Sequence, residues 1–289
     1  MKKYWLLILI SNASFGSTLN VGLVGQYNFD KGTAEDTSGN NNNGTAFNVI
    51  TSIGVQGGAF KFNGINSIIK INTLIPHYTT SGTIFSWYRA NPNPDLSVQS
   101  PYGGIAAAYQ TILGQNRKQN DYAPGLFLTI WNPEYLQTGY FSSANFKIRS
   151  GYSDEFPGNL SWHNIELESQ SPESMGLDGV WHSIGTSISS NENGKTLKLY
   201  FDGNLVSSSN FGNPDIEAFT NGEFFIGGSA DVSDPRSSFN GDIDNVYVYN
   251  RTLTEQEIFD LHTSTPEPSA FSLLAVGLGG MAILRRRRS

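Results

Sequence analysis

The sequence predicts an all-β protein made of many short antiparallel strands, and three observations support this. Apolar and polar residues alternate along much of the chain, as they do in strands that bury one face. The 289 residues include 31 glycines and 12% aromatic residues but only 15% charged residues, which suits short strands joined by turns. Between its two terminal segments the chain has roughly 250 residues, an ordinary size for a single sandwich or barrel.

The alternating pattern places strands from one end of the chain to the other. They are expected at 23–29, 83–88, 126–131, 224–228 and 243–249, and in two hairpins at 60–71, with its turn at Asn63-Gly64, and at 196–206. The clearest hairpin is 196–206, because Asp202-Gly203 favours a type I′ turn, in which both central residues have positive φ. Residues 91–176 are less regular, and we expect strands carrying long loops there rather than a second domain.

One short helix is predicted near the C-terminal end, starting after Thr254 and ending by Thr263. Thr254 can cap the first turn while Glu257, three residues later, reaches back to it. Leu253 and Ile258 occupy the two positions of a hydrophobic staple. We therefore expect this helix to pack one apolar face on the sheets.

Both ends of the chain carry segments typical of exported proteins. Lys2 and Lys3 precede an apolar stretch at 4–10 and small or polar residues up to Gly16, the order of a signal peptide cleaved after Gly16. The alternative for this end is a buried N-terminal strand. At the other end, an apolar run at 270–284 is followed by four arginines at 285–288. As a membrane-anchor helix the run would be about 22 Å long, shorter than a hydrocarbon core of roughly 30 Å, with the arginines on the cytoplasmic side.

The tail at 264–289 resembles the PEP-CTERM sorting signal of Gram-negative bacteria, with Pro266, Glu267 and Pro268 as the recognition triplet. The resemblance implies processing by an exosortase, a transpeptidase-like enzyme of the inner membrane. It also implies transient anchoring in that membrane and delivery to the cell surface or the exopolysaccharide matrix. The alternative is a plain membrane anchor with a chance triplet, which would leave the compartment unchanged.

Charge and cysteine content limit the partners and the means of stabilisation. The net charge is −7, and removing the +6 of Lys2, Lys3 and the four arginines leaves −13 on the rest of the chain. Such a domain lacks the cations that displace phosphate counterions, so we expect no nucleic-acid partner. The sequence has no cysteine, so stability must come from the core or from a metal rather than from disulfides.

Six segments in order resemble the LamG-like jellyroll family, within the concanavalin-type lectin and glucanase sandwiches. They are 26–30, 36–45, 58–64, 179–183, 199–203 and 239–253. The resemblance covers roughly residues 20 to 262, is weakest in the middle, and implies a two-sheet antiparallel jellyroll sandwich at 17–263. It also implies a module that binds carbohydrate or protein.

No pair of catalytic carboxylates is recognisable. The glucanases that the chain resembles share a Glu-x-Asp-x-x-Glu strand, which is absent here. Glu166 and Glu168 can share a strand face, but residues two apart stand about 7 Å from each other, whereas a retaining glycosidase needs about 5–5.5 Å. We therefore expect a non-catalytic carbohydrate-binding, matrix-binding or adhesion protein. The alternative is a secreted glycoside hydrolase of the same fold.

Three aspartates are candidates for a structural calcium site. Asp244 has the parity of Val246 and Val248, so it would point inward and need a partner if those valines face the core. Asp30 and Asp36 follow the first strand, and many proteins that the chain resembles tie their first and last strands together with calcium there. The alternative is that Asp30 and Asp36 cap turns while Asp244 accepts backbone N–H groups.

Exposed aromatic rings are the candidates for sugar stacking. The best placed, in or beside the irregular middle, are Trp131, Tyr135, Tyr140 and Trp162. Trp87 and Trp181 are expected to pack in the core. Each candidate can instead serve packing, as most aromatic residues of a sandwich do.

Overall fold

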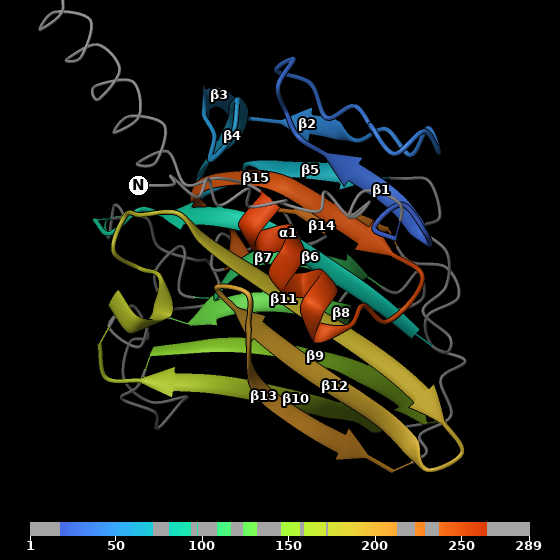
Figure 1. Ribbon diagram of the computed structural model, residues 1–289. Helices are drawn as coiled ribbons and strands as arrows, with labels where there is room; N and C mark the ends of the chain where they lie inside the picture. The colour runs from blue at the N-terminus through green and yellow to red at the C-terminus, as the bar shows by residue number, and fades with distance from the viewer. Residues whose placement is uncertain are drawn as a thin grey trace, which may run out of the picture.

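A computed structural model describes residues 18–71, 81–93, 97, 109–116, 124–131, 146–156, 159–171, 173–212, 223–228 and 237–264. Two antiparallel sheets pack face to face, which confirms the predicted all-β sandwich (Figure 1). The first sheet has the order β13-β12-β11-β6-β15-β4-β3, with β1 also paired to β15, and the second has the order β10-β9-β8-β7-β14-β5-β2.

The strand bounds show how the chain alternates between the sheets. The first sheet contains β1 (Leu23–Tyr27), β3 (Ile50–Ile53), β4 (Gly58–Asn63), β6 (Ser81–Ala90), β11 (His182–Asn191), β12 (Gly194–Phe201), β13 (Asn204–Phe211) and β15 (Asn240–Tyr249). The second contains β2 (Thr45–Phe47), β5 (Ile68–Ile71), β7 (Tyr109–Asn116), β8 (Pro124–Trp131), β9 (Phe146–Phe156), β10 (Asn159–Ser169) and β14 (Phe224–Ile226). A 3-10 turn, η2 (Glu173–Met175), precedes β11, and α1 (Glu255–Ser264) follows β15. Residues of the irregular middle thus form the four consecutive strands β7 to β10.

The centre of the first sheet is buried on both faces, whereas its edge strands β3 and β13 are largely exposed. Ile84 and Tyr88 of β6 belong to the core between the sheets, whereas Phe85 and Trp87 of the same strand belong to a second apolar cluster that includes Ile258 of α1. Figure 1 shows α1 lying against the first sheet on the side away from the second sheet. Burial of both faces explains why the predicted strand at 83–88 reads as an almost continuous apolar run.

The local signals for the hairpin at 196–206 and for the helix cap are confirmed, whereas the hairpin predicted at 60–71 is wrong, because β4 and β5 belong to different sheets. Asp202 and Gly203 have φ values of 46° and 74°, as a type I′ turn requires. The backbone N–H of Glu257 donates to Thr254 Oγ1 at 3.2 Å, and the N–H of Thr254 donates to Glu257 Oε2 at 2.9 Å. This is a capping box, and α1 ends at Ser264, one residue later than predicted.

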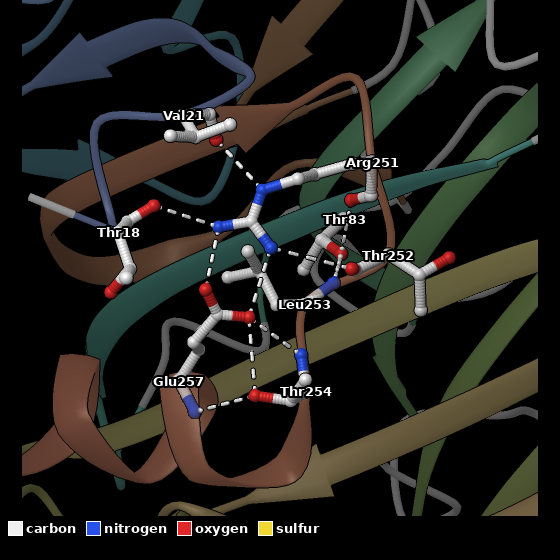
Figure 2. Close-up of polar contacts among 8 residues, drawn as sticks. All are labelled: Thr18, Val21, Thr83, Arg251, Thr252, Leu253, Thr254 and Glu257. Carbon is white, nitrogen blue, oxygen red and sulfur yellow. Dashed lines mark hydrogen bonds and ion pairs between the residues drawn. The ribbon is translucent and has the colours of Figure 1, made fainter.

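One arginine joins the beginning of the described chain to the first turn of α1 (Figure 2). Arg251 Nε donates to the carbonyl oxygen of Val21 at 2.7 Å, and Nη2 donates to that of Thr18 at 3.0 Å. Nη1 and Nη2 also donate to the two carboxylate oxygens of Glu257, at 2.9 and 2.7 Å. We call these four residues the Arg251 clamp.

The backbone around the clamp is fixed to the first sheet. Thr83 Oγ1 of β6 donates to the carbonyl oxygen of Arg251 and accepts the N–H of Leu253, each at 2.9 Å (Figure 2). Thr252 Oγ1 donates to the carbonyl oxygen of Ile188 in β11, also at 2.9 Å. The connection from β15 to α1 is therefore held by two neighbouring strands.

The described part of the chain has no helix long and apolar enough to span a membrane. The predicted signal peptide at 1–16 and the tail from Thr265 onward lie outside the described residues.

Candidate functional site

The outer face of strands β8 to β10 gathers an aromatic ring and four charged side chains. Ile130, Ile148 and Ile165 of these strands belong to the core between the sheets, so residues of the opposite parity face outward. We call the outward-facing residues the outer strand face: Trp131, Lys147, Arg149, Glu166 and Glu168.

The four charged side chains of the outer strand face form one ion-pair network. Lys147 Nζ lies 2.8 Å from Glu166 Oε2 and 2.6 Å from Glu168 Oε1. Arg149 Nε donates to Glu166 Oε1 at 2.6 Å, and its Nη2 contacts the same oxygen. Burial by itself lowers the pKa of Lys147, but the hydrogen bonds and charges of Glu166 and Glu168 outweigh it and raise this pKa, so the ammonium stays charged at neutral pH.

Trp131 contacts two neighbours from different strands. The Arg149 guanidinium lies 4.0 Å from the centroid of the Trp131 ring, within cation–π range. On β7, the ring of Tyr109 meets the Trp131 ring edge to face, with centroids 4.7 Å apart. The indole is therefore an ordered platform whose orientation is fixed by β7 and β9.

Of the other three aromatic candidates, only Trp162 lies within the described residues. Trp162 lies in β10 opposite Ser153, at a position with the parity of Glu166. Tyr135 and Tyr140 lie outside the described residues. Trp87 is 1% exposed beneath α1, as predicted for a core tryptophan, whereas Trp181 is only partly buried where it packs against the same cluster.

Lys147 and Arg149 were not among the residues singled out from the sequence. The signal was present, because Lys-x-Arg at 147–149 and Glu-x-Glu at 166–168 are both alternating pairs of one charge. Only the antiparallel register of β9 with β10, which sets Arg149 opposite Glu166 and Lys147 opposite Glu168, shows that the pairs meet.

The network also bears on the possibility of catalysis at Glu166. A catalytic carboxyl needs an oxygen available to a water, a leaving group or the anomeric carbon. Glu166 Oε1 is bonded to Arg149 and Oε2 to Lys147, so both oxygens are already engaged by cations. This arrangement suits a fixed polar surface better than a hydrolytic acid or nucleophile.

The three candidate metal ligands do not form one cluster. Asp36 Oδ1 accepts the backbone N–H groups of Gln26 and Ser38 at 3.0 and 2.9 Å. Its Oδ2 accepts the N–H of Asn42 at 2.9 Å. Asp36 is thus oriented toward backbone amides and organises the loop after β1. Within the described ranges, no group of three or more His, Cys, Asp or Glu side chains is placed to hold a metal ion.

Asp244 is fully buried, but the inference that it shares the face of Val246 and Val248 is wrong. The pairing of β15 with β6 is irregular between Asp244 and Tyr247, and Asn245 has a φ of 47°. This bulge reverses the parity. Val246 and Val248 face the core between the sheets, whereas Asp244 lies opposite Trp87 on the face that α1 covers.

Asp30 and Asp244 flank the turn between β3 and β4. Asp30 Oδ1 accepts the N–H of Gly58 at 2.8 Å, and the Asp244 oxygens accept the N–H groups of Asn245 and Gln56 at 2.6 and 3.3 Å. Burial raises the pKa of Asp244 to about 7 and the charge of Asp30 adds to the rise, while the amide donors oppose it. Two carboxylates therefore lie at this turn, and Asp36 is not one of them.

Two parts of the chain match known families. Residues 131–259 match the concanavalin A-like lectin/glucanases superfamily, and residues 264–288 match the PEP-CTERM protein-sorting motif. Both matches confirm the resemblances found in the sequence. No curated protein matches the chain.

Solved structures share the fold at low sequence identity. Domain 4 of AbnA, a GH43 extracellular arabinanase from Geobacillus stearothermophilus solved in complex with arabinotriose, is 18% identical with a TM-score of 0.50, covering 83% of this chain and 98% of that domain. The binding domain of Paraclostridial Mosquitocidal Protein 1 is 20% identical with a TM-score of 0.55, covering 85% of this chain and 53% of the other. The binding domain of botulinum neurotoxin DC, in complex with rat synaptotagmin II, is 16% identical with a TM-score of 0.55, covering 86% and 52%. The chain spans about half the length of the two toxin domains, and at these identities the likeness shows the fold alone.

Proposed function

We propose that this chain, which joins a domain of the concanavalin A-like lectin/glucanase superfamily to a PEP-CTERM sorting motif, is an exported, non-catalytic module that binds carbohydrate or matrix. The ligand contacts the outer strand face, where Trp131 supplies a ring for stacking, and the sequence-predicted candidates Tyr135, Tyr140 and Trp162 supply further rings. An exosortase-type enzyme processes the tail, which is held transiently in the inner membrane of a Gram-negative bacterium. The protein then reaches the cell surface or the extracellular matrix.

The observation that carries the proposal is the ordered ring of Trp131 beside a fixed set of polar groups. Binding sites for small ligands combine aromatic surface with a few polar groups held in place. Trp131 is positioned by Arg149 and Tyr109, and Arg149 is itself held by Glu166. The arabinanase domain in complex with arabinotriose and the toxin binding domains support a binding role for this architecture.

Removing the aromatic candidates tests this function. We expect the combined replacement of Trp131, Tyr135, Tyr140 and Trp162 by alanine to reduce retention on a cognate polysaccharide at least about tenfold, because a ligand loses its stacking surface. Affinity electrophoresis against a panel of polysaccharides measures this. Phe259→Ala removes a ring that is 45% exposed on α1 and should leave retention unchanged.

The same panel distinguishes binding from hydrolysis. We expect no release of reducing sugar by the wild-type protein, since both oxygens of Glu166 are engaged. Turnover that disappears in Glu166→Gln would show that the chain is a glycoside hydrolase instead. Full retention by the fourfold aromatic variant would place the ligand on another surface.

The sorting role rests on the tail. In a host that carries an exosortase, replacing Pro266 and Glu267 by alanine is expected to hold the protein at the inner membrane, because the recognition triplet precedes an apolar run too short for a stable anchor. Cell fractionation and immunoblotting measure this. Release equal to that of the wild type would contradict sorting through the triplet and leave a plain anchor.

We also propose that calcium stabilises the turn between β3 and β4 that Asp30 and Asp244 flank, with backbone carbonyl oxygens and water completing the shell. Calcium at a hundredfold excess over Kd would stabilise the fold by about 2.7 kcal/mol. The melting temperature should then rise by about 5–10 °C relative to the protein in chelator. Asp244→Asn should abolish this difference and Asp36→Asn should keep it, whereas identical wild-type melting curves with calcium and with chelator would eliminate the site.

A further inference from the structure

The charges of the outer strand face are balanced within the face itself. Lys147 and Arg149 supply two cations, and Glu166 and Glu168 supply two carboxylates. Their side chains are 12%, 20%, 22% and 41% exposed in that order, so most of the network is withdrawn from water. A ligand that reaches the ring of Trp131 meets paired charges rather than a free cation.

An anionic sugar would have to break this network. A carboxylate or sulfate of a ligand could gain Arg149 or Lys147 only by displacing Glu166, which would then be left partly buried without its partners. Glu166 and Glu168 would also repel the incoming anion. Apart from the cations of its two terminal segments the chain carries −13, which disfavours the approach of a polyanion.

An uncharged sugar can add to the network without breaking it. A hydroxyl group is both donor and acceptor, whereas each carboxylate oxygen can accept more than one hydrogen bond and a guanidinium has five N–H groups. Sugar hydroxyls can therefore bond to Glu166 and Arg149 while the two stay paired. The apolar face of the same sugar can stack on the ring that Arg149 and Tyr109 hold in place.

Resting on the proposed function, we infer that the ligand of the outer strand face is an uncharged, hydroxyl-rich glycan and that the paired charges exclude uronate and sulfated polymers. Lys147 and Arg149 serve to hold the two carboxylates as hydrogen-bond acceptors. The carboxylates in turn keep the cations from capturing anionic polymers.

The test uses the full chain, purified in a mild detergent, in native gels containing either neutral or anionic polymers. Debranched arabinan, galactan and dextran are the neutral probes, and polygalacturonate and alginate are the anionic ones. We expect retention on at least one neutral polymer, changing less than about twofold between roughly 0.05 and 0.5 M salt, because no net charge is neutralised on binding. No retention is expected on the anionic polymers.

A charge variant tests whether the two carboxylates of the outer strand face keep its cations from binding anionic polymers. The combined replacement of Glu166 and Glu168 by glutamine leaves Lys147 and Arg149 without counter-ions, and retention on an anionic polymer should rise at least about tenfold in a salt-sensitive manner. The matched control replaces Glu35 and Glu255, which pair with lysines elsewhere at 2.9 and 2.8 Å, and removes the same charge. Circular dichroism and melting curves check that both variants fold.

The outcomes distinguish an error in the charge assigned to the ligand from an error in the proposed glycan binding itself. Salt-sensitive wild-type retention on an anionic polymer that is lost in Trp131→Ala would overturn the uncharged ligand but keep glycan binding at this face. Retention on no polymer of either kind would contradict glycan binding itself. Equal gains for the charge variant and its control, or no gain for either, would overturn the role assigned to the ion-pair network.

Discussion

Replacing Glu257 by alanine is expected to lower the free energy of unfolding by about 2–3 kcal/mol at pH 7. The Glu257 side chain is 14% exposed and forms a bidentate ion pair with Arg251, with contacts of 2.7 and 2.9 Å. The same carboxylate accepts the N–H of Thr254 in the capping box. The substitution therefore removes a cap and leaves a guanidinium, itself 25% exposed, without its partner. Urea unfolding followed by tryptophan fluorescence measures the loss.

The pH dependence separates the ion pair from the cap. The hydrogen bonds from Arg251, with its charge and the Thr254 N–H, lower the pKa of Glu257 from 4.5 to about 2 against the opposing effect of burial. A carboxyl whose pKa is lower in the folded state stabilises the fold above its unfolded pKa, and this stabilisation is lost as the pH falls through the folded pKa. The stability difference between wild type and Glu257→Gln should be constant above about pH 5 and shrink toward pH 2. A difference that does not change over this range would contradict the ion-pair account.

Asp36→Ala is expected to cost about 2–4 kcal/mol, because one side chain accepts three backbone N–H groups. Asp36 is 7% exposed, and its loss leaves the amides of Gln26, Ser38 and Asn42 without their acceptor. The loop it organises also supplies the carbonyl oxygen of Asn42 that accepts the hydroxyl of Tyr27, at 2.7 Å.

Two further substitutions, measured by chemical denaturation, test whether this loss of stability comes from the Asp36 carboxylate. Asp36→Asn keeps one acceptor oxygen and should cost less than Asp36→Ala. Glu35→Ala removes the neighbouring carboxylate, whose pair with Lys31 is exposed, and should change stability by less than about 0.5 kcal/mol. Equal costs for Asp36→Ala and Glu35→Ala would show that the loop does not depend on the Asp36 carboxylate.

The features predicted correctly from the sequence are those whose cause is local. The type I′ turn at Asp202-Gly203 needs positive φ at two adjacent residues, and the cap of α1 needs Thr254 and Glu257 three residues apart. The apolar run at 83–88 indicated a buried strand, although nothing in it indicated that α1 covers its second face. Spacing within one segment is sufficient for such inferences.

The features that the sequence did not predict depend on register between distant segments. The orientation of Asp244 follows from one bulge residue, Asn245, whose positive φ no alternation pattern reveals. Lys147 and Arg149 join the candidate site only because β9 and β10 pair in one register. A shift of a single residue would turn these cations to the opposite face.

The Arg251 clamp makes the domain suitable for circular permutation. Thr18 and the first turn of α1 are bonded to the same guanidinium, and α1 itself rises only about 15 Å from its first residue to Ser264. A flexible linker of a few residues from Ser264 back to Thr18 could therefore close the domain into a ring, and new termini could be opened in a surface turn such as Asn191–Gly194. The same closeness allows the domain to be inserted as one unit into an exposed loop of another protein, where entry and exit lie close together.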